Sequence, residues 1–256
     1  MTVAATEQRP GARTRESNRL IRIGGGLIAA LIVIAVAAPL LAPHDPEAVI
    51  FGLRASLAVS IAAVLGSFVV AVPLGLAAGY FGRWTDSAIS RLLDLILVFP
   101  AMLLAVAFIA VLGPGSSIAA LAIAVIYLPI LARVMRASTL IVSRNDYVSG
   151  ARARGASHWR AIVQHVAPNA LGPAVVQASV LAAFALQLEA GLSFLGLGTQ
   201  PPTPSLGGML ADGREVLVQA PWVEIFPGLA IVIAVLGFTF LGEGLRRALD
   251  PRGVAE

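Results

Sequence analysis

The stretch from Leu95 to Ala132 contains no charged residue, and this constrains the fold more than any other feature of the chain. The hydrocarbon core of a bilayer is about 30 Å thick, and a helix crosses it with roughly 20 apolar residues. The stretch is therefore too long for one crossing. It contains a strong turn signal, GPGSS, between Gly113 and Ser117, which predicts two membrane-spanning helices joined by a short turn.

The composition of the whole chain agrees with this interpretation. Hydrophobic residues make up 58% of the 256 residues and charged residues only 12%, a balance foreign to soluble domains. Backbone groups inside lipid must be bonded within the protein, and the period-two alternation of membrane barrels is absent. We therefore expect an all-α polytopic membrane protein with six transmembrane helices. The expected spans are Gly24–Ala42, Ala55–Gly79, Ile89–Leu112, Ile118–Met135, Leu171–Leu197 and Val223–Leu241.

The basic residues predict the orientation of these spans. All 18 are arginine, and all but Arg54 and Arg214 lie on one side of the predicted spans. Short loops that are rich in basic residues stay in the cytoplasm. We therefore expect both chain termini on the cytoplasmic side. The expected divisions are a cytoplasmic N-terminal tail (1–23), a first transmembrane helix (24–42), a five-helix domain (55–245) with a cytoplasmic polar insert (145–168), and a cytoplasmic C-terminal tail (246–256).

One alternative concerns the start of the chain. Basic residues followed by an apolar run and by Ala35-Val36-Ala37 also occur in secretory signal peptides, and cleavage would leave a chain that starts near Ala38. The apolar run continues through Leu41, and the basic leader is long. These features favour an uncleaved first span.

The composition excludes several kinds of site. Without cysteine, the chain has no disulfide, no thiolate nucleophile and no cysteine-based metal site. Without lysine, it cannot carry the phosphate-binding loop G-x-x-x-x-G-K-[ST], so any ATP chemistry needs another subunit. The histidines (His44, His158 and His165) form no metal-binding pattern, and no nucleophile elbow or paired intramembrane carboxylates occur. The arginines do not form one basic face, which argues against nucleic-acid binding. We therefore expect no catalytic residue, metal site or cofactor.

The polar insert has ordered helix signals on both sides of a glycine. Asp146 is a suitable N-cap for a helix that runs to Arg154, and Gly155 would end it. Ser157 can cap a second helix, His158–Val166, which Pro168 would end. On that second helix one predicted face carries Trp159, Ile162, Val163 and Val166.

Two interpretations of this insert remain open from the pattern alone. It could be an interfacial helix that lies on the bilayer with its arginines towards the lipid headgroups. Alternatively, it could be a coupling element that fits a cleft in a cytoplasmic ATPase.

The insert resembles a known family. Gly155 is followed ten residues later by His165-Val166-Ala167-Pro168, a spacing similar to the EAA loop of ABC importer permeases. Other segments resemble the second permease subunit of the dipeptide, oligopeptide and nickel branch. These segments are Gly75–Gly82, Asp94–Pro100, Leu192–Gly198, Gln200–Ser205 and Leu249–Arg252. Two features depart from the family pattern: Ser149-Gly150-Ala151 replaces the usual E-A-A, and the stretch between the first two spans is short.

The resemblance implies a type I ABC importer permease fold in the cell inner membrane. It implies three kinds of protein partner: a second permease subunit that forms a heterodimer with this chain, two cytoplasmic ATPase subunits, and an extracytoplasmic solute-binding protein. The residues expected to couple to the ATPase are Ala151, Gly155, Ser157, Trp159, Arg160, His165 and Pro168.

Polar and small residues within the spans give further expectations. A carboxylate inside a span is costly, so Glu189 is a candidate for the translocation path, although a hydrogen-bonded packing role is an equal alternative. We expect Asp94 to pair with Arg91 one helical turn away. Pro100 should kink the third span. Three glycines of the second span should allow close helix approach: Gly66, Gly75 and Gly79. The external loop from Thr199 to Trp222 resembles the region that faces a solute-binding protein.

The expected function is therefore transport. The leading hypothesis is a permease subunit of an ATP-driven, binding-protein-dependent importer, which forms half of the pore for di- and oligopeptides and is not itself an enzyme. The same scaffold could import nickel or another small solute. A secondary transporter driven by an ion gradient is a further alternative, although the internal repeats and mid-membrane polar residues typical of that class are not evident.

Overall fold

A computed structural model describes residues 10–36 and 47–249. Within these ranges the chain is helical and contains no β-strand, which confirms the expected all-α class. The helices are α1 (Pro10–Val36), α3 (Glu47–Phe81), α4 (Arg83–Leu97), α5 (Ala101–Leu112), α6 (Ser116–Val142), α7 (Asp146–Ala153), α8 (His158–Ala161), η1 (Ile162–Val166, a π-helix), α9 (Ala167–Phe194), α10 (Leu206–Gly213) and α11 (Trp222–Leu249).

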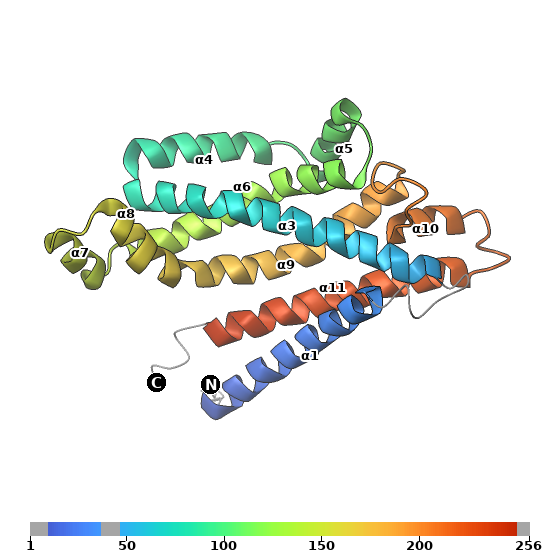
Figure 1. Ribbon diagram of the computed structural model, residues 1–256, viewed down its shortest axis with the longest axis horizontal. Coiled ribbons are helices and arrows are strands. Elements are labelled where there is room, and N and C mark those ends of the chain that lie inside the picture. Colours follow the sequence, from blue (N-terminus) through green and yellow to red (C-terminus); the bar gives the residue numbers. More distant parts are fainter. Residues whose placement is uncertain (1–9, 37–46, 250–256) are drawn as a thin grey trace, which may run out of the picture.

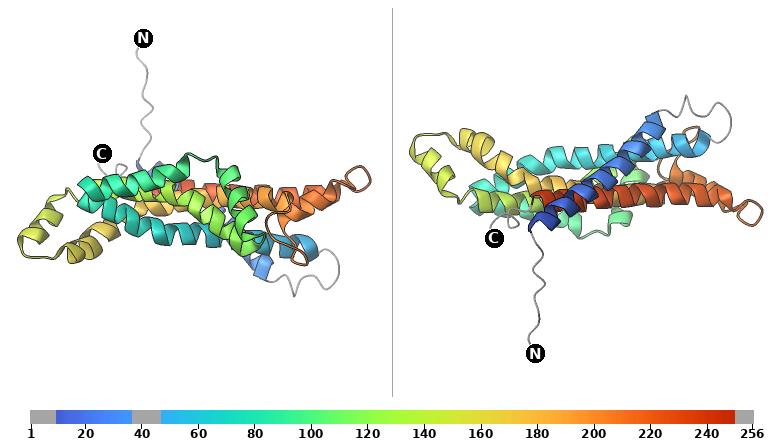
Figure 2. Two further views of the ribbon diagram at one scale, coloured as in Figure 1. Left: turned by 90° about the horizontal axis from the view of Figure 1, so that it is seen from above. Right: turned by 90° about the horizontal axis from the view of Figure 1, so that it is seen from below.

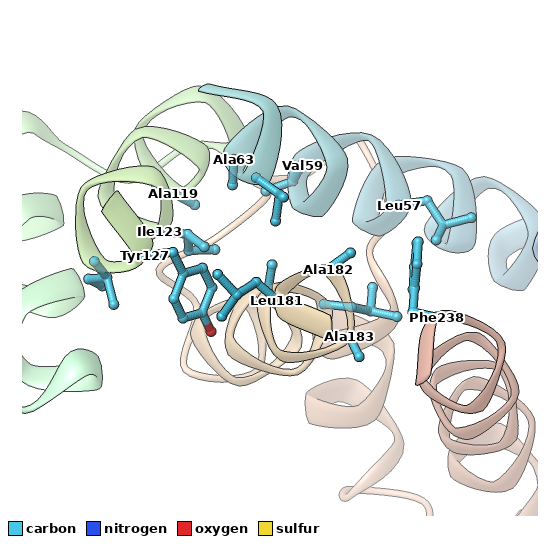
Figure 3. Close-up of a cluster of buried hydrophobic side chains, with 14 of the residues drawn as sticks. Leu57, Val59, Ala63, Ala119, Ile123, Tyr127, Leu181, Ala182, Ala183 and Phe238 are labelled. Carbon is cyan, nitrogen blue, oxygen red and sulfur yellow. The ribbon is translucent and has the colours of Figure 1, made fainter. Parts of the chain in front are cut away.

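The long helices run side by side along one axis (Figure 1). The pair α3 and α6 forms the most extensive helix contact, α9 packs against both, and α11 packs between α9 and α1. Small buried side chains such as Ala63, Ala119 and Ala182 alternate with larger ones such as Ile123 and Leu181 where three helices meet (Figure 3). Small residues let helices approach closely in lipid, where water provides no hydrophobic drive between them.

The closest approach of α3 to α6 occurs at two glycines. A Cβ atom on Gly75 would lie 2.6 Å from the Cβ of Met135 and 2.7 Å from the carbonyl oxygen of Ala132. A Cβ atom on Gly79 would lie 2.7 Å from the carbonyl oxygen of Arg136. The close-approach prediction is therefore confirmed for these two positions. At Gly66 the nearest atom would be 3.7 Å away, an ordinary contact, so the prediction is wrong there.

The expected third span, Ile89–Leu112, is not one straight crossing. It is divided into α4 and α5, which are bent by 86° at a break of three residues that ends with Pro100. Proline removes one backbone hydrogen bond, and it also disfavours the α-helical conformation of the residue before it. The predicted kink at Pro100 is confirmed in position, but the result is a break rather than a bend within one helix.

Four described helices are long and apolar enough to cross a membrane, and five if the bent pair α4–α5 counts as one span. They correspond to five of the six expected spans, with longer bounds. The turn predicted at 113–117 is confirmed, because Gly113 and Gly115 have φ angles of 91° and 153° and separate α5 from α6. The remaining expected span, the first (Gly24–Ala42), falls partly on α1 and partly outside the described residues. The alternative cleavage site near Ala38 lies outside the described residues.

We predict that Gly75→Ala destabilises the protein while Gly66→Ala does not. Alanine raises helix propensity by about 1 kcal/mol at either position. At Gly75 the added methyl group meets backbone atoms of α6, and overpacking of this kind typically costs about 1–3 kcal/mol. The melting temperature of the purified full-length protein in detergent should therefore fall for Gly75→Ala and stay equal or rise for Gly66→Ala. Equal melting temperatures for both variants would contradict the close packing of α3 on α6.

Candidate functional site

The polar insert, residues 145–168, lies at one end of the molecule (Figure 1). It contains α7, α8 and η1, and it joins the end of α6 to the start of α9. The loop from Thr199 to Ser205 and α10 lie at the opposite end, as the second views also show (Figure 2). The two regions that the sequence singled out are therefore separated by the full length of the bundle.

A glycine turn separates α7 from α8, as predicted. Gly155 has a φ of 90°, which glycine adopts without strain. Its N–H donates to the carbonyl oxygen of Arg152 at 3.0 Å, and the N–H of Ala156 donates to that of Ala151 at 3.1 Å. These two bonds form a Schellman motif. The hydroxyl oxygen of Ser157 then accepts the N–H of Arg160 at 3.2 Å, which confirms the predicted cap of the second helix.

The predicted start and end of α7 need small corrections. Asn145 occupies the cap position and α7 begins at Asp146, so Asp146 is the first helical residue and not the N-cap. Its carboxylate still lies in the first turn, where the helix dipole favours a negative charge. The helix ends at Ala153, one residue earlier than expected.

Pro168 does not end the helix that follows Ser157, and the expectation that it would is wrong. The chain is helical without interruption from His158 to Phe194. Pro168 lies in the first turn of α9, directly after the π-helix η1. The wider π turn carries hydrogen bonds from residue i to i+5, so it relieves the clash of the proline ring with the preceding turn.

The prediction that Trp159, Ile162, Val163 and Val166 form one apolar face of the second helix is also wrong. Ile162 and Val166 are buried, and Val166 packs against Met135 and Val148. In contrast, Trp159 is 73% exposed and Val163 is 45% exposed. The π turn changes the number of residues per turn between Trp159 and Val166, so the four residues separate into two stripes with a spacing of four. One stripe faces the protein and the other is exposed.

His158 connects three helices within this site. The hydroxyl of Tyr80, at the end of α3, lies 3.2 Å from its Nδ1, and the two rings meet edge to face at 5.7 Å. On the other side, Nη2 of Arg152 lies 2.9 Å from Nε2. A guanidinium group only donates, so Nε2 accepts and the proton of the neutral ring is on Nδ1. The sequence singled out His158 only as a poor metal ligand and gave no indication of this contact.

Two ion pairs fix α4 to α6, and neither was predicted. Asp86 pairs with Arg136 through both carboxylate oxygens, and Asp94 pairs with Arg133. The expected pair of Asp94 with Arg91 is therefore wrong. Helix α4 lies alongside α6 in space, and a partner on a neighbouring helix is invisible to a rule based on spacing within one helix.

Glu189 is completely buried near the C-terminal end of α9. Its Oε1 accepts a hydrogen bond of 2.7 Å from Ser193, whose hydroxyl oxygen accepts the N–H of Thr199 at 3.2 Å. The hydroxyl oxygen of Ser56 on α3, which is also buried, accepts the N–H of Leu206 at 3.2 Å. No hydrogen bond of standard geometry reaches Oε2. These contacts connect α9 and α3 to the segment that leads into α10.

The structure brings the candidate coupling residues together and leaves Glu189 at the other end. Gly155, Ser157, Trp159, Arg160 and Pro168 are exposed on the polar insert. His165 is partly buried, and Ala151 is buried beneath the glycine turn.

Comparison with known proteins identifies the family. A family model described as binding-protein-dependent transport system inner membrane component matches residues 71–253, which is more than half of the chain. The chain belongs to this family. A second model, for the N-terminal transmembrane domain of oligopeptide transport permease C, matches residues 17–58. Systems of this family use a solute-binding protein and hydrolyse ATP in separate subunits.

Curated relatives extend over most of the chain. The dipeptide transport system permease protein DppC of Alkalihalophilus pseudofirmus is 38% identical over 97% of this chain and 91% of its own length. The glutathione transport system permease protein GsiD of Pectobacterium atrosepticum is 42% identical over 80% of this chain and 68% of its own length. The di/tripeptide transport system permease protein DppC of Pseudomonas aeruginosa is 36% identical over 89% of this chain and 87% of its own length.

Solved structures of ABC transporters share the fold. The inward-facing MetNI methionine transporter superposes with a TM-score of 0.65 at 20% identity, covering 80% of this chain and 99% of that chain. An amino acid ABC transporter with histidines gives a TM-score of 0.60 at 17% identity, covering 77% of this chain and 92% of that chain. The expected ABC permease fold is therefore confirmed.

We predict that His158→Phe loosens the polar insert. The substitution keeps an aromatic ring beside Tyr80 but removes both side-chain hydrogen bonds, each of which contributes about 0.5–1.5 kcal/mol. Amide hydrogen exchange in residues 146–161 should then become roughly tenfold faster. His165→Phe is the matched control, because its carbonyl oxygen rather than its ring accepts the bond from Asn169. Equal exchange in the two variants would show that His158 does not hold the insert.

Proposed function

We propose that this chain is one permease subunit of an ATP-driven, binding-protein-dependent importer of di- and oligopeptides. In this proposal it forms a heterodimeric pore with a second permease subunit, two cytoplasmic ATPase subunits bind the polar inserts, and an external solute-binding protein delivers the cargo. The chain itself is not an enzyme, because ATP hydrolysis belongs to the ATPase subunits. The observation that carries the proposal is the exposed Trp159–Val163 stripe on an insert that internal contacts hold in place.

The arrangement of charges supports a cytoplasmic position for the insert. The start of α1 and the end of α11 lie towards the same end of the bundle as the insert (Figures 1 and 2). Arg246 and Arg247 lie in the last turn of α11, and Arg152, Arg154 and Arg160 lie in the insert. By the positive-inside rule this end faces the cytoplasm, so both chain termini do as well.

The insert has the properties of a docking surface. Aromatic residues that remain exposed beside arginine are typical of interface hot spots. The Schellman turn at Gly155 and the contact of His158 with Tyr80 and Arg152 fix the insert before a partner binds. A surface that is ordered in advance loses less conformational entropy on binding. When the ATPases move, the insert would therefore transmit the movement to α6 and α9, which it joins.

We predict that Trp159→Ala weakens assembly with the ATPase subunits by tenfold or more, since hot-spot tryptophans contribute about 2 kcal/mol or more. The measurement is co-purification from native membranes, combined with ATP-dependent uptake. Trp84→Ala is the matched control, because Trp84 is 82% exposed on α4, outside the insert.

Full assembly of Trp159→Ala would contradict the coupling role of the insert. The interfacial-helix alternative predicts a different result: lipid-borne quenchers should reach Trp159 in the complete complex. Under the coupling proposal the bound ATPase shields Trp159, whereas Trp84 remains accessible to the quencher.

The names of the relatives support peptide cargo. They refer to dipeptide, di/tripeptide and glutathione transport, and all of these cargos are short peptides. Uptake of labelled di- and tripeptides by the complete complex, compared with nickel uptake, tests the cargo. Uptake that persists without an ATPase subunit and follows an ion gradient would contradict the importer proposal.

The role of Glu189 in the translocation path stays a prediction, and two substitutions separate it from packing. Glu189→Gln keeps the volume and the acceptor for Ser193, whereas Glu189→Ala leaves a cavity and a buried hydroxyl without its partner. If Glu189 serves packing, Glu189→Ala should lose about 2–4 kcal/mol of stability, and Glu189→Gln should retain both stability and uptake. If it acts in the path, Glu189→Gln should keep the melting temperature but lose peptide uptake.

A further inference from the structure

The charge of His158 determines how many helices of the insert its ring can hold together. The ring lies between Tyr80, at the end of α3, and Arg152, in the last turn of α7. Helix α7 extends past the end of α3, and the chain turns back through Gly155 into α8 (Figures 1 and 2). Histidine is the side chain whose charge changes near neutral pH, and none of the roles proposed above uses this property.

A side-chain hydrogen bond attaches α7 to α8. Nη2 of Arg152 donates to Nε2 of His158 at 2.9 Å, and among the described residues no other side-chain hydrogen bond joins the two helices. Nη1 of the same arginine donates to the carbonyl oxygen of Ala156 at 2.8 Å, in the turn between α7 and α8. Arg152 therefore closes the insert through an acceptor that exists only while the histidine is neutral.

Protonation of His158 removes this acceptor. An imidazolium ring carries a hydrogen on both nitrogens and accepts a hydrogen bond at neither. Nε2 of His158 and Nη2 of Arg152 would then be two donors on two positive groups, 2.9 Å apart. Guanidinium groups stay charged at any physiological pH, so the repulsion is relieved only when the arginine moves away.

The contact of His158 with α3 does not depend on the same nitrogen. Nδ1 carries a hydrogen in both charge states, and it lies 3.2 Å from the hydroxyl oxygen of Tyr80, which can accept it. The Tyr80 ring meets the imidazole ring edge to face at 5.7 Å, and the Phe81 ring lies 6.0 Å away. Protonation therefore breaks the contact with α7 and preserves the contact with α3.

The charges around His158 do not offset an added proton. Among the described residues, the titratable or charged groups that interact with its ring are Tyr80 from α3 and Arg152 from α7, and neither is a carboxylate. The sequence from 145 to 168 contains three arginines and a single carboxylate, Asp146. Asp146 lies in the first turn of α7, at the opposite end from Arg152. The proton is thus added to a positive region, which strengthens the repulsion.

We propose that His158 is a proton-operated switch in the polar insert. The neutral ring holds α7 to α8 and α3, and the protonated ring releases α7 while α8 stays on α3. The consequence for transport rests on the proposed function: the ATPase docking surface is ordered at neutral pH and loosens when the cytoplasm becomes acidic. Import would then slow as the cytoplasmic pH falls.

The test measures amide hydrogen exchange of the full-length protein in lipid nanodiscs at about pH 7.5 and about pH 5.5, where an ordinary histidine is mostly neutral and mostly protonated, respectively. Each rate is divided into the intrinsic rate at the same pH, which gives a protection factor that is free of the intrinsic effect of acid. In the wild type, protection of residues 146–156 should fall about fivefold at the lower pH, while protection of residues 158–166 stays within about twofold.

Two glutamine substitutions form a matched pair. In His158→Gln the amide oxygen can accept from Arg152 but the side chain does not titrate, so protection of residues 146–156 should be equal at both pH values. His165→Gln removes the other histidine of the insert and should keep the fall seen in the wild type. Arg152→Gln covers the case in which His158→Gln disturbs the insert: without the guanidinium, protection should be low at both pH values.

Two exchange results would overturn the switch. One is a fall in His158→Gln or Arg152→Gln as large as that of the wild type, because another group would then be responsible. The other is an equal fall throughout residues 146–166, which would indicate general loosening in acid.

The link to docking is tested separately, by the affinity of the ATPase subunits for the complete permease pair at the same two pH values. Binding should weaken about fivefold in acid for the wild type, and by less than about twofold for His158→Gln. Equal pH dependence in both would overturn the effect on docking. If the ATPase subunits fail to bind even at neutral pH, the proposed importer function is wrong, while the exchange data still decide whether the switch exists.

Discussion

The close contact between α3 and α6 is the constraint on which the other contacts of the structure depend. Without side chains at Gly75 and Gly79, the two backbones approach until a single methyl group would collide with α6. This approach places Tyr80, one residue after Gly79, beside His158 of the polar insert. On the other face of α6, the arginines of the same turns hold α4 through two ion pairs. The position of α4 on α6 and the contact of Tyr80 with the polar insert therefore both depend on the close approach at these two glycines.

Helix α9 connects the two functional ends. From His158 to Phe194 the chain is helical without interruption, and the π turn lets it pass Pro168. At one end it continues from α8 and η1 of the polar insert, where Trp159 is exposed. At the other end, Glu189 and Ser193 fix the segment that leads into α10.

The sequence predicted those features that depend on a few neighbouring residues. The turn at 113–117, the glycine turn at Gly155 and the cap at Ser157 all occur where the residue types required them. The close helix approach at Gly75 and Gly79 was also predicted, but the specific side-chain partners on a second helix were missed. Asp94 pairs with Arg133 on α6 and not with Arg91 on its own helix. The apolar face of the second insert helix was divided by a π turn, because half of it packs on α6 and α7 while the other half is exposed.

By itself, the amino-acid sequence determined the all-α membrane class, the positions of the main apolar helices and the presence of an ordered polar insert. These follow from helix length, hydrophobicity and local turn chemistry, which need no knowledge of the neighbours. The tertiary structure alone decided that α4 and α5 form a bent pair, that His158 joins the insert to α3, and that Glu189 and Ser193 fix the segment that leads into α10. Each of these arises where segments distant in the sequence meet, and spacing along one helix carries no information about which distant residue will be its neighbour.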